Sequence, residues 1–166
     1  AGTPTVGWST RDLKLNYATP VTHNGLLFGY SGAFLSCVDA GTGALKWRSR
    51  APGDGFPIIV DGHLVVLTKD GRISVAEATG AGYTEQAGLE VFQRLVWTPP
   101  SFAHGRIYAR DSYDAIAAID VVPAARTTDV TPGAVDGTVP GSAFARWVAS
   151  VEASPDRDQM VTSWMA

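Results

Sequence analysis

The sequence predicts an all-β protein built from repeated four-stranded antiparallel units, and three observations support this prediction. A motif that runs from proline to glycine occurs three times, each copy is followed by two apolar runs, and the segments between them lack helical periodicity. The copies occupy residues 20–25, 57–62 and 100–105, so that their prolines lie 37 and 43 residues apart. This regular spacing indicates an internal repeat.

In each unit the second apolar run ends in an acidic residue. The acids follow the motif glycine by 14, 15 and 15 residues, and they are Asp39, Glu77 and Asp120. The strands between the turns are rich in β-branched and aromatic residues, and several are apolar at consecutive positions. A strand has that pattern when both faces of its sheet are covered.

The turns of each unit fit a meander. Asn24-Gly25 and Asp61-Gly62 favour two-residue hairpins, because glycine tolerates the positive φ of a type I′ turn. Further glycines, at 32, 71 and in the Thr-Gly pairs after the acids, mark the later turns. Four short strands about every 40 residues, covered on both faces, are typical of a β-propeller blade. The prediction is therefore a β-propeller segment of about three four-stranded antiparallel blades over residues 1–122.

The repeat frame is incomplete at both ends. Trp8 begins a Trp-x-[Ser/Thr]-Arg pattern that recurs at Trp47, which indicates a lone outer strand, while the third unit ends at Asp120 without such a strand. Phe92 or Trp97 is the candidate for the same position in the middle unit. Because a ring needs about four to eight blades, we expect a fragment of a larger propeller, poorly soluble or self-associating. Closure through copies, or covering of the end faces by the tail or a partner, are the alternatives.

The first unit resembles the PQQ-like β-propeller repeat, shared by quinoprotein alcohol dehydrogenases and by the lipoprotein of the bacterial outer-membrane assembly machine. The resemblance covers roughly residues 5–122 and is carried best by residues 20–25, 31–32, 35–39, 40–43 and 45–47. It implies that Trp47, and with it Trp8, docks between neighbouring blades. It also implies a bacterial protein in the periplasm or another extracytoplasmic location. Many relatives are scaffolds that bind no quinone.

Composition excludes several classes of function. The 166 residues carry a net charge of −3, which argues against a surface for nucleic acid or anionic lipid. No apolar run reaches the roughly 18 residues of a membrane-spanning helix. The single cysteine, Cys37, excludes an internal disulfide framework and a cysteine-cluster metal site, and its place in a strand predicts a buried thiol.

No catalytic, cofactor-binding or metal-ligating residue is assigned from the sequence. The acids at the strand ends are expected to accept N–H groups from the following Thr-Gly turns. The histidines flank hairpin turns, where we expect them to be solvated; they are His23, His63 and His104. No cofactor is expected in this segment, and PQQ with Ca²⁺ is implied only if the chain is part of a dehydrogenase.

One group of side chains is a candidate rim for a ligand or a partner. It surrounds the second hairpin of the third unit and consists of Arg106, Tyr108, Arg110, Asp111, Tyr113 and Asp114. The alternative interpretation is a solvated blade edge.

The last part of the chain has a different composition. Residues 123–142 are rich in proline and glycine and predict a linker. In residues 143–166, Phe144, Trp147, Val148 and Val151 follow helical spacing, which predicts an amphipathic helical tail and the possible start of another domain.

Together these observations predict a non-catalytic scaffold or protein-interaction platform. Its partner would be a protein or the remaining blades of the same propeller. One alternative is a segment of a PQQ-dependent alcohol dehydrogenase-type quinoprotein. The other is an accessory propeller that precedes a hydrolase-type catalytic domain.

Overall fold

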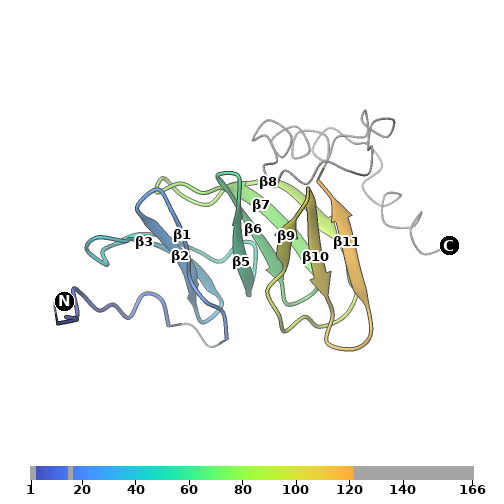
Figure 1. Ribbon diagram of the computed structural model, residues 1–166, viewed down its shortest axis with the longest axis horizontal. Coiled ribbons are helices and arrows are strands. Elements are labelled where there is room, and N and C mark those ends of the chain that lie inside the picture. Colours follow the sequence, from blue (N-terminus) through green and yellow to red (C-terminus); the bar gives the residue numbers. More distant parts are fainter. Residues whose placement is uncertain (1–2, 15–16, 122–166) are drawn as a thin grey trace.

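The computed structural model describes residues 3–14 and 17–121, and within these ranges the protein is all-β. Three antiparallel sheets stand side by side, with their faces toward one another (Figure 1). The predicted propeller segment is confirmed. The predicted linker, residues 123–142, and the predicted helical tail, residues 143–166, lie outside the described residues.

Each sheet is one blade and follows chain order. Blade 1 consists of β1 (Val21–His23), β2 (Leu26–Ser31), β3 (Phe34–Asp39) and β4 (Leu45–Ser49). Blade 2 consists of β5 (Gly55–Val60), β6 (His63–Thr68), β7 (Arg72–Glu77) and β8 (Glu85–Glu90). Blade 3 has three described strands, β9 (Ser101–Ala103), β10 (Arg106–Arg110) and β11 (Ile116–Asp120).

The first turn of every blade has the same backbone geometry. Asn24, Asp61 and His104 have φ of 46°, 48° and 51°, and the glycine that follows each also has positive φ. After the third strand, a backbone N–H returns to the carbonyl of that glycine in all three blades. The bonds run from Ala40 to Gly25, from Ala78 to Gly62 and from Val121 to Gly105, at 2.8, 3.0 and 2.9 Å. The three repeats therefore occupy equivalent surroundings.

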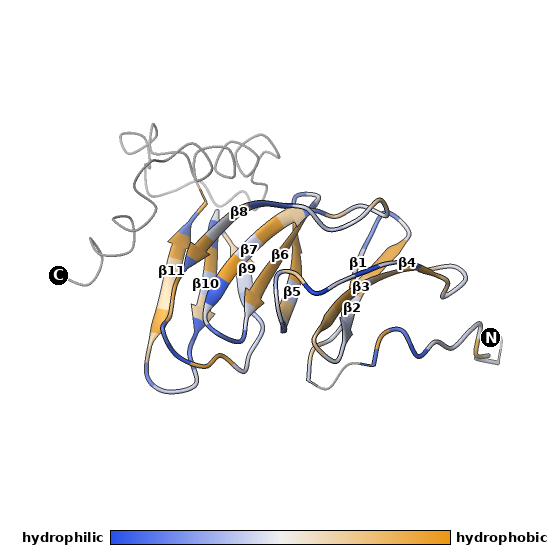
Figure 2. Ribbon diagram, turned by 180° about the vertical axis from the view of Figure 1, so that it is seen from behind, coloured by the Kyte–Doolittle hydropathy of each residue, from blue (hydrophilic) through white to orange (hydrophobic). Residues whose placement is uncertain are grey.

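Blade 2 explains why consecutive positions are apolar. In β6, Leu64 and Val66 belong to the core shared with blade 1, whereas Val65 and Leu67 belong to the core shared with blade 3. Successive side chains of a strand point to opposite faces, so a strand covered on both sides is apolar throughout. Figure 2 shows hydrophobic colour along the middle strands of this blade.

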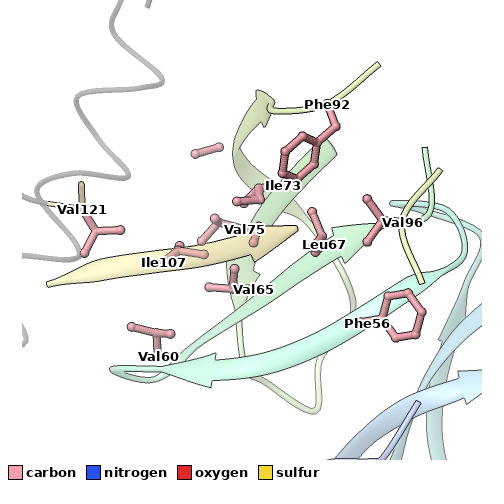
Figure 3. Close-up of a cluster of buried hydrophobic side chains, with 12 residues drawn as sticks. Phe56, Val60, Val65, Leu67, Ile73, Val75, Phe92, Val96, Ile107 and Val121 are labelled. Carbon is pink, nitrogen blue, oxygen red and sulfur yellow. The ribbon is translucent and has the colours of Figure 1, made fainter. Parts of the chain in front are cut away.

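Two clusters hold the blades together. Between blades 1 and 2, Phe28 and Leu35 are completely buried. Between blades 2 and 3, Ile107 of β10 lies against the face that carries Val65 and Val75 (Figure 3). At about 25 cal/mol per Å² of apolar surface removed from water, these faces are the main source of stability.

Tryptophan joins one blade to the next, as the repeat implied. The Nε1 atom of Trp47 donates a hydrogen bond to the carbonyl of Thr79 at 2.8 Å, and that of Trp8 donates to the carbonyl of Ala40 at 3.0 Å. Both bonds span 32 residues. Trp8 and Trp47 therefore dock on the following blade in the same way.

The expected outer strand at Trp8 is not formed in the described residues. Its side chain is docked, but a strand also needs a hydrogen-bonded neighbour, and the described residues supply no inner strands on that side of blade 1.

In the middle blade, Ala87 stands opposite Val75 as Trp47 stands opposite Cys37, so alanine takes the tryptophan position. Phe92 is buried in the core between blades 2 and 3, whereas Trp97 is 46% exposed. Of the two candidates, only Phe92 contributes to packing between these blades.

The third blade has three strands within the described residues, which end at residue 121. No helix in the described ranges is long and apolar enough to cross a membrane.

Replacing Trp47 with alanine should lower the free energy of unfolding by about 2–4 kcal/mol, because the indole packs between blades and only part of it is exposed. Trp47→Phe keeps a ring but loses the bond to Thr79, and should cost about 1 kcal/mol. Urea denaturation followed by circular dichroism measures both. Leu45→Ala, on the same strand and 43% exposed, is the control. Equal losses for Trp47→Ala and Leu45→Ala would contradict the docking role.

Candidate functional site

The rim expected from the sequence divides into two groups. Side chains alternate along β10, so that Ile107 and Ala109 are buried against blade 2, while Arg106 and Arg110 are exposed on the other face. The Nε atom of Arg106 lies 2.6 Å from Oδ1 of Asp120 on the neighbouring strand. This half of the rim is a cross-strand ion pair on the outer face of blade 3.

The other group lies at the turn between β10 and β11, at the lower edge of the molecule in Figure 1. Asp111 is 4% exposed, and its Oδ1 accepts backbone N–H groups from Tyr113 at 2.9 Å and Ala115 at 3.0 Å. Burial acts to raise the pKa of Asp111, but the backbone N–H groups of this turn outweigh it and lower that pKa. Asp111 therefore stabilises the turn.

Arg94 joins this group from the connection between β8 and β9. Its guanidinium lies 3.3 Å from the carboxylate of Asp114 and 5.3 Å from the centre of the Tyr113 ring. A groove of about 430 Å³ lies beside it and is lined by Glu90, Val91, Phe92, Gln93, Arg94, Asp111, Asp114 and Ala115. The sequence analysis missed Arg94, because this residue lies in a connection between blades, where the repeat has no fixed pattern.

The sequence analysis also missed a second group of neighbouring side chains, which centres on Trp97. Tyr17 and Trp97 form an edge-to-face pair with ring centres 5.9 Å apart. The ammonium group of Lys69 lies 4.8 Å from the centre of the Trp97 ring and 2.6 Å from the carboxylate of Asp54. These four residues come from four separate segments, and only folding brings them together.

The backbone links the two groups into one surface. Ser112 donates its N–H to the carbonyl of Leu95 at 2.9 Å, and Val96 donates to that of Lys69 at 2.9 Å. We call this the connection-face surface, and it consists of Tyr17, Lys69, Arg94, Leu95, Trp97 and Tyr113. Its aromatic and aliphatic side chains are 43–77% exposed. It combines a hydrogen-bonded backbone with exposed rings, the exposed Arg94 and the partly buried Lys69.

The acids that end the third strands have different roles. Oδ1 of Asp39 accepts N–H groups from Gly41 and Thr42, and the hydrogen bonds from Thr42 are the main cause that lowers the pKa of Asp39. The expected turn-capping role is confirmed there. Asp120 pairs with Arg106, which stands directly opposite on β10, and the residues that follow Val121 lie outside the described ranges, so the capping role stays a prediction there.

The histidines and Cys37, which the sequence analysis also considered, do not form a common site in the described residues. Asn24 lies 2.9 Å from the His23 ring, and the His63 ring lies 2.9 Å from the carbonyl of Asp61. Among the described residues, no three His, Cys, Asp or Glu side chains are placed to hold a metal ion. Cys37 is completely buried, as expected, and mainly this burial raises the pKa of its thiol to about 11.

Replacing Asp111 with alanine should lower the midpoint of thermal unfolding by roughly 3–6 °C, because backbone donors of the turn lose their acceptor. Asp111→Asn retains an acceptor oxygen and should have a smaller effect. A carboxyl with a lowered pKa stabilises the fold above its ordinary pKa of about 3.9 and loses that contribution as pH falls. The difference between wild type and Asp111→Ala should therefore shrink in acid. A constant difference from pH 7 to pH 2.5 would argue against the carboxylate as its source.

Comparison with known proteins identifies the family to which this fold belongs. A family model described as outer membrane protein assembly factor BamB matches residues 2–159. The structure of BamB from Moraxella catarrhalis is similar with a TM-score of 0.50 and 19% identity, over 61% of this chain and 32% of that one. The computationally designed Ika4 protein gives a TM-score of 0.52 and 16% identity, over 68% and 74%.

A quinohemoprotein alcohol dehydrogenase from Pseudomonas putida HK5 is also similar, with a TM-score of 0.49 and 15% identity, over 59% of this chain and 17% of that one. The comparison with curated proteins found no match. The chain spans about a third of the length of the BamB structure. With the family model matched over most of its length and three equivalent blades in its structure, the chain belongs to the PQQ-like β-propeller family that includes the outer membrane protein assembly factor BamB.

Proposed function

We propose that this part of the propeller is a non-catalytic scaffold that binds a protein partner through the connection-face surface. The observation that supports the proposal is the grouping of Tyr17, Trp97 and Tyr113 with Lys69 and Arg94 on a single face. Tyrosine, tryptophan and arginine are the residue types enriched at the centres of protein interfaces. The sequence candidates Asp111 and Asp114 contribute a turn and an ion pair at the edge of this surface.

The charges of the surface favour a protein over a polyanion. Lys69 is paired with Asp54 and Arg94 with Asp114, so that each cation has an acid beside it. Nucleic acid binding depends on an excess of cations that replace counterions. Exposed aromatic rings lie between cations whose charge is balanced by a neighbouring acid. Such a surface fits a protein partner whose own surface is partly apolar and partly polar.

The surface is also well ordered for binding. The backbone of the connection is fixed by N–H bonds to Lys69 and from Ser112, while Phe92 is anchored in the core. A partner therefore has little loop entropy to overcome, and preordering of this kind raises affinity. The proposed location is the periplasm or another extracytoplasmic compartment, which the description of the matched family as an outer membrane assembly factor supports.

The alternative function is that of a quinone-dependent dehydrogenase segment. Such a site would need carboxylates that are free to hold a divalent ion beside the quinone. Two of the three strand-end acids are engaged elsewhere, Asp39 by its turn and Asp120 by Arg106. This engagement supports the scaffold proposal over the dehydrogenase alternative, and no reaction step is assigned to the quinone.

Addition of PQQ with Ca²⁺ separates the two functions. We expect no binding-induced change in quinone absorbance and no dye-linked oxidation of primary alcohols, because residues 3–14 and 17–121 assemble no carboxylate set for a metal ion. A quinoprotein dehydrogenase serves as the positive control. Saturable PQQ binding with alcohol oxidation would refute the scaffold proposal.

Site-specific photo-crosslinking tests the surface itself. A photoreactive residue at Leu95 should give a discrete protein adduct in cells of the natural host, whereas one at Leu45 should not; both leucines are 43% exposed. Adding Trp97→Ala should lower the Leu95 adduct about tenfold, as loss of roughly 1.4 kcal/mol at an interface residue does. Equal adducts from both positions, or no effect of Trp97→Ala, would rule out the connection-face surface.

A further inference from the structure

Trp97 differs from the other two described tryptophans in the use of its indole N–H group. The Nε1 atoms of Trp8 and Trp47 donate interblade hydrogen bonds at 3.0 and 2.8 Å. Within residues 3–14 and 17–121, Nε1 of Trp97 has no acceptor, and the side chain is exposed. A tryptophan that joins no blades therefore presents a free hydrogen-bond donor at the connection-face surface.

Tyr17 stands beside this indole. The two rings are perpendicular, with their centres 5.9 Å apart, and both are exposed. We call this pair of rings the aromatic corner. The Tyr17 hydroxyl group makes no hydrogen bond within the described ranges, and it can donate or accept one. A ligand in the aromatic corner therefore meets two apolar ring surfaces together with polar groups at their rims.

The acceptor groups next to the aromatic corner are already in use. The carbonyl of Leu95 accepts the N–H of Ser112 at 2.9 Å. The carbonyl of Lys69 accepts the N–H of Val96, also at 2.9 Å. The carboxylate of Asp54 lies 2.6 Å from Nζ of Lys69. A ligand rich in N–H groups would bury donors without acceptors, which costs free energy. The surface therefore favours a ligand that brings acceptors and few donors.

The surface beside the aromatic corner is shallow. The hollow there has a volume of about 10 Å³ and is lined in part by Tyr17, Phe56 and Lys69. This volume holds about one water molecule and does not admit a large side chain. The ion pair between Lys69 and Asp54 leaves no unbalanced charge beside the rings. The ligand must therefore lie across the rings, and it needs no charge of its own.

We propose that the aromatic corner binds a proline-rich segment of the partner in the extended polyproline II conformation. Proline has no backbone N–H, and a polyproline II helix makes no internal hydrogen bonds. Its carbonyls are therefore free to accept the indole N–H of Trp97, while its uncharged rings lie against exposed aromatic surface, as in other aromatic-lined sites for such segments. This inference rests on the proposed function and adds the chemical class of the partner.

Lys69 holds the Trp97 ring in place before a ligand arrives. Its ammonium group lies over the ring, 4.8 Å from the ring centre, and is itself held by Asp54. An ammonium over an indole face is attracted by the ring quadrupole. One face of Trp97 is thereby occupied, and the N–H edge stays available. Because both binding partners are ordered in advance, little conformational entropy is lost on association.

Titration of the ¹⁵N-labelled chain with decaproline, a peptide of ten prolines with blocked ends, tests the proposal by NMR. We expect a saturable shift of the Trp97 indole N–H signal, which is assigned through its loss in Trp97→Phe. The indole signals of Trp8 and Trp47 should not move, because their N–H groups are bonded between blades. A glycine-serine peptide of equal length is the control ligand, because it is flexible and carries N–H groups. No shift at Trp97, or equal shifts with both peptides, would overturn the proposal.

Trp97→Phe keeps an aromatic ring but removes the donor. It should raise the dissociation constant for decaproline about three- to tenfold, as the loss of one hydrogen bond does. Isothermal titration calorimetry measures this constant, and a thermal melt followed by circular dichroism checks that the variant is folded. Leu45→Ala, on β4 and outside the connection-face surface, is the control variant and should bind as the wild type does. Equal constants for Trp97→Phe and wild type would contradict a role for the indole N–H.

Competition separates this inference from the proposed function. Saturating decaproline, added to a host-cell extract before illumination, should lower the adduct from a photoreactive residue at Leu95 to the level found at Leu45. An adduct that decaproline does not reduce would refute the proline-rich partner and leave the scaffold function in place. The absence of any Leu95 adduct would refute both.

Discussion

The packing of one blade against the next is the constraint on which the rest of the structure depends. A sheet of four short strands cannot bury both of its faces by itself, and blade 2 does so only because blades 1 and 3 lie on either side of it. The consecutive apolar residues of β6 and the interblade tryptophan bonds are both consequences. The repeat period follows for the same reason, because each unit must present the same two faces.

This packing also positions the connection-face surface. The chain must leave each blade at its outer strand and return to the axis to begin the next, so that connections between blades cross one face of the molecule. Tyr17 and residues 94–97 lie on such connections, beside the turn that Asp111 stabilises. Rigid sheets thus hold a mixed aromatic and cationic surface that contributes little to the core. Loops held by rigid elements of this kind commonly carry binding and catalytic residues.

Most of the fold could be predicted from local chemistry. The hairpins at Asn24 and Asp61 have the positive φ that their glycine pairs indicated, and Cys37 is buried in the strand where its neighbours placed it. The missed features depend on partners distant in sequence. Arg106 binds Asp120, fourteen residues away in the chain, because the two residues stand opposite each other on paired strands. The rim separated into two groups because alternation along β10 turns Arg106 away from Asp111.

The sequence by itself determined the repeat, the hairpin turns and the two-sided burial of the strands, because these depend on residues close together in the chain and on a fixed spacing. It also indicated that Trp8 and Trp47 are equivalent, through the Trp-x-[Ser/Thr]-Arg pattern that the two share. Only the tertiary structure decided which side chains share a surface. Lys69, Trp97 and Tyr17 meet because separate blades stack about a common axis, and a linear pattern contains no information about that distance.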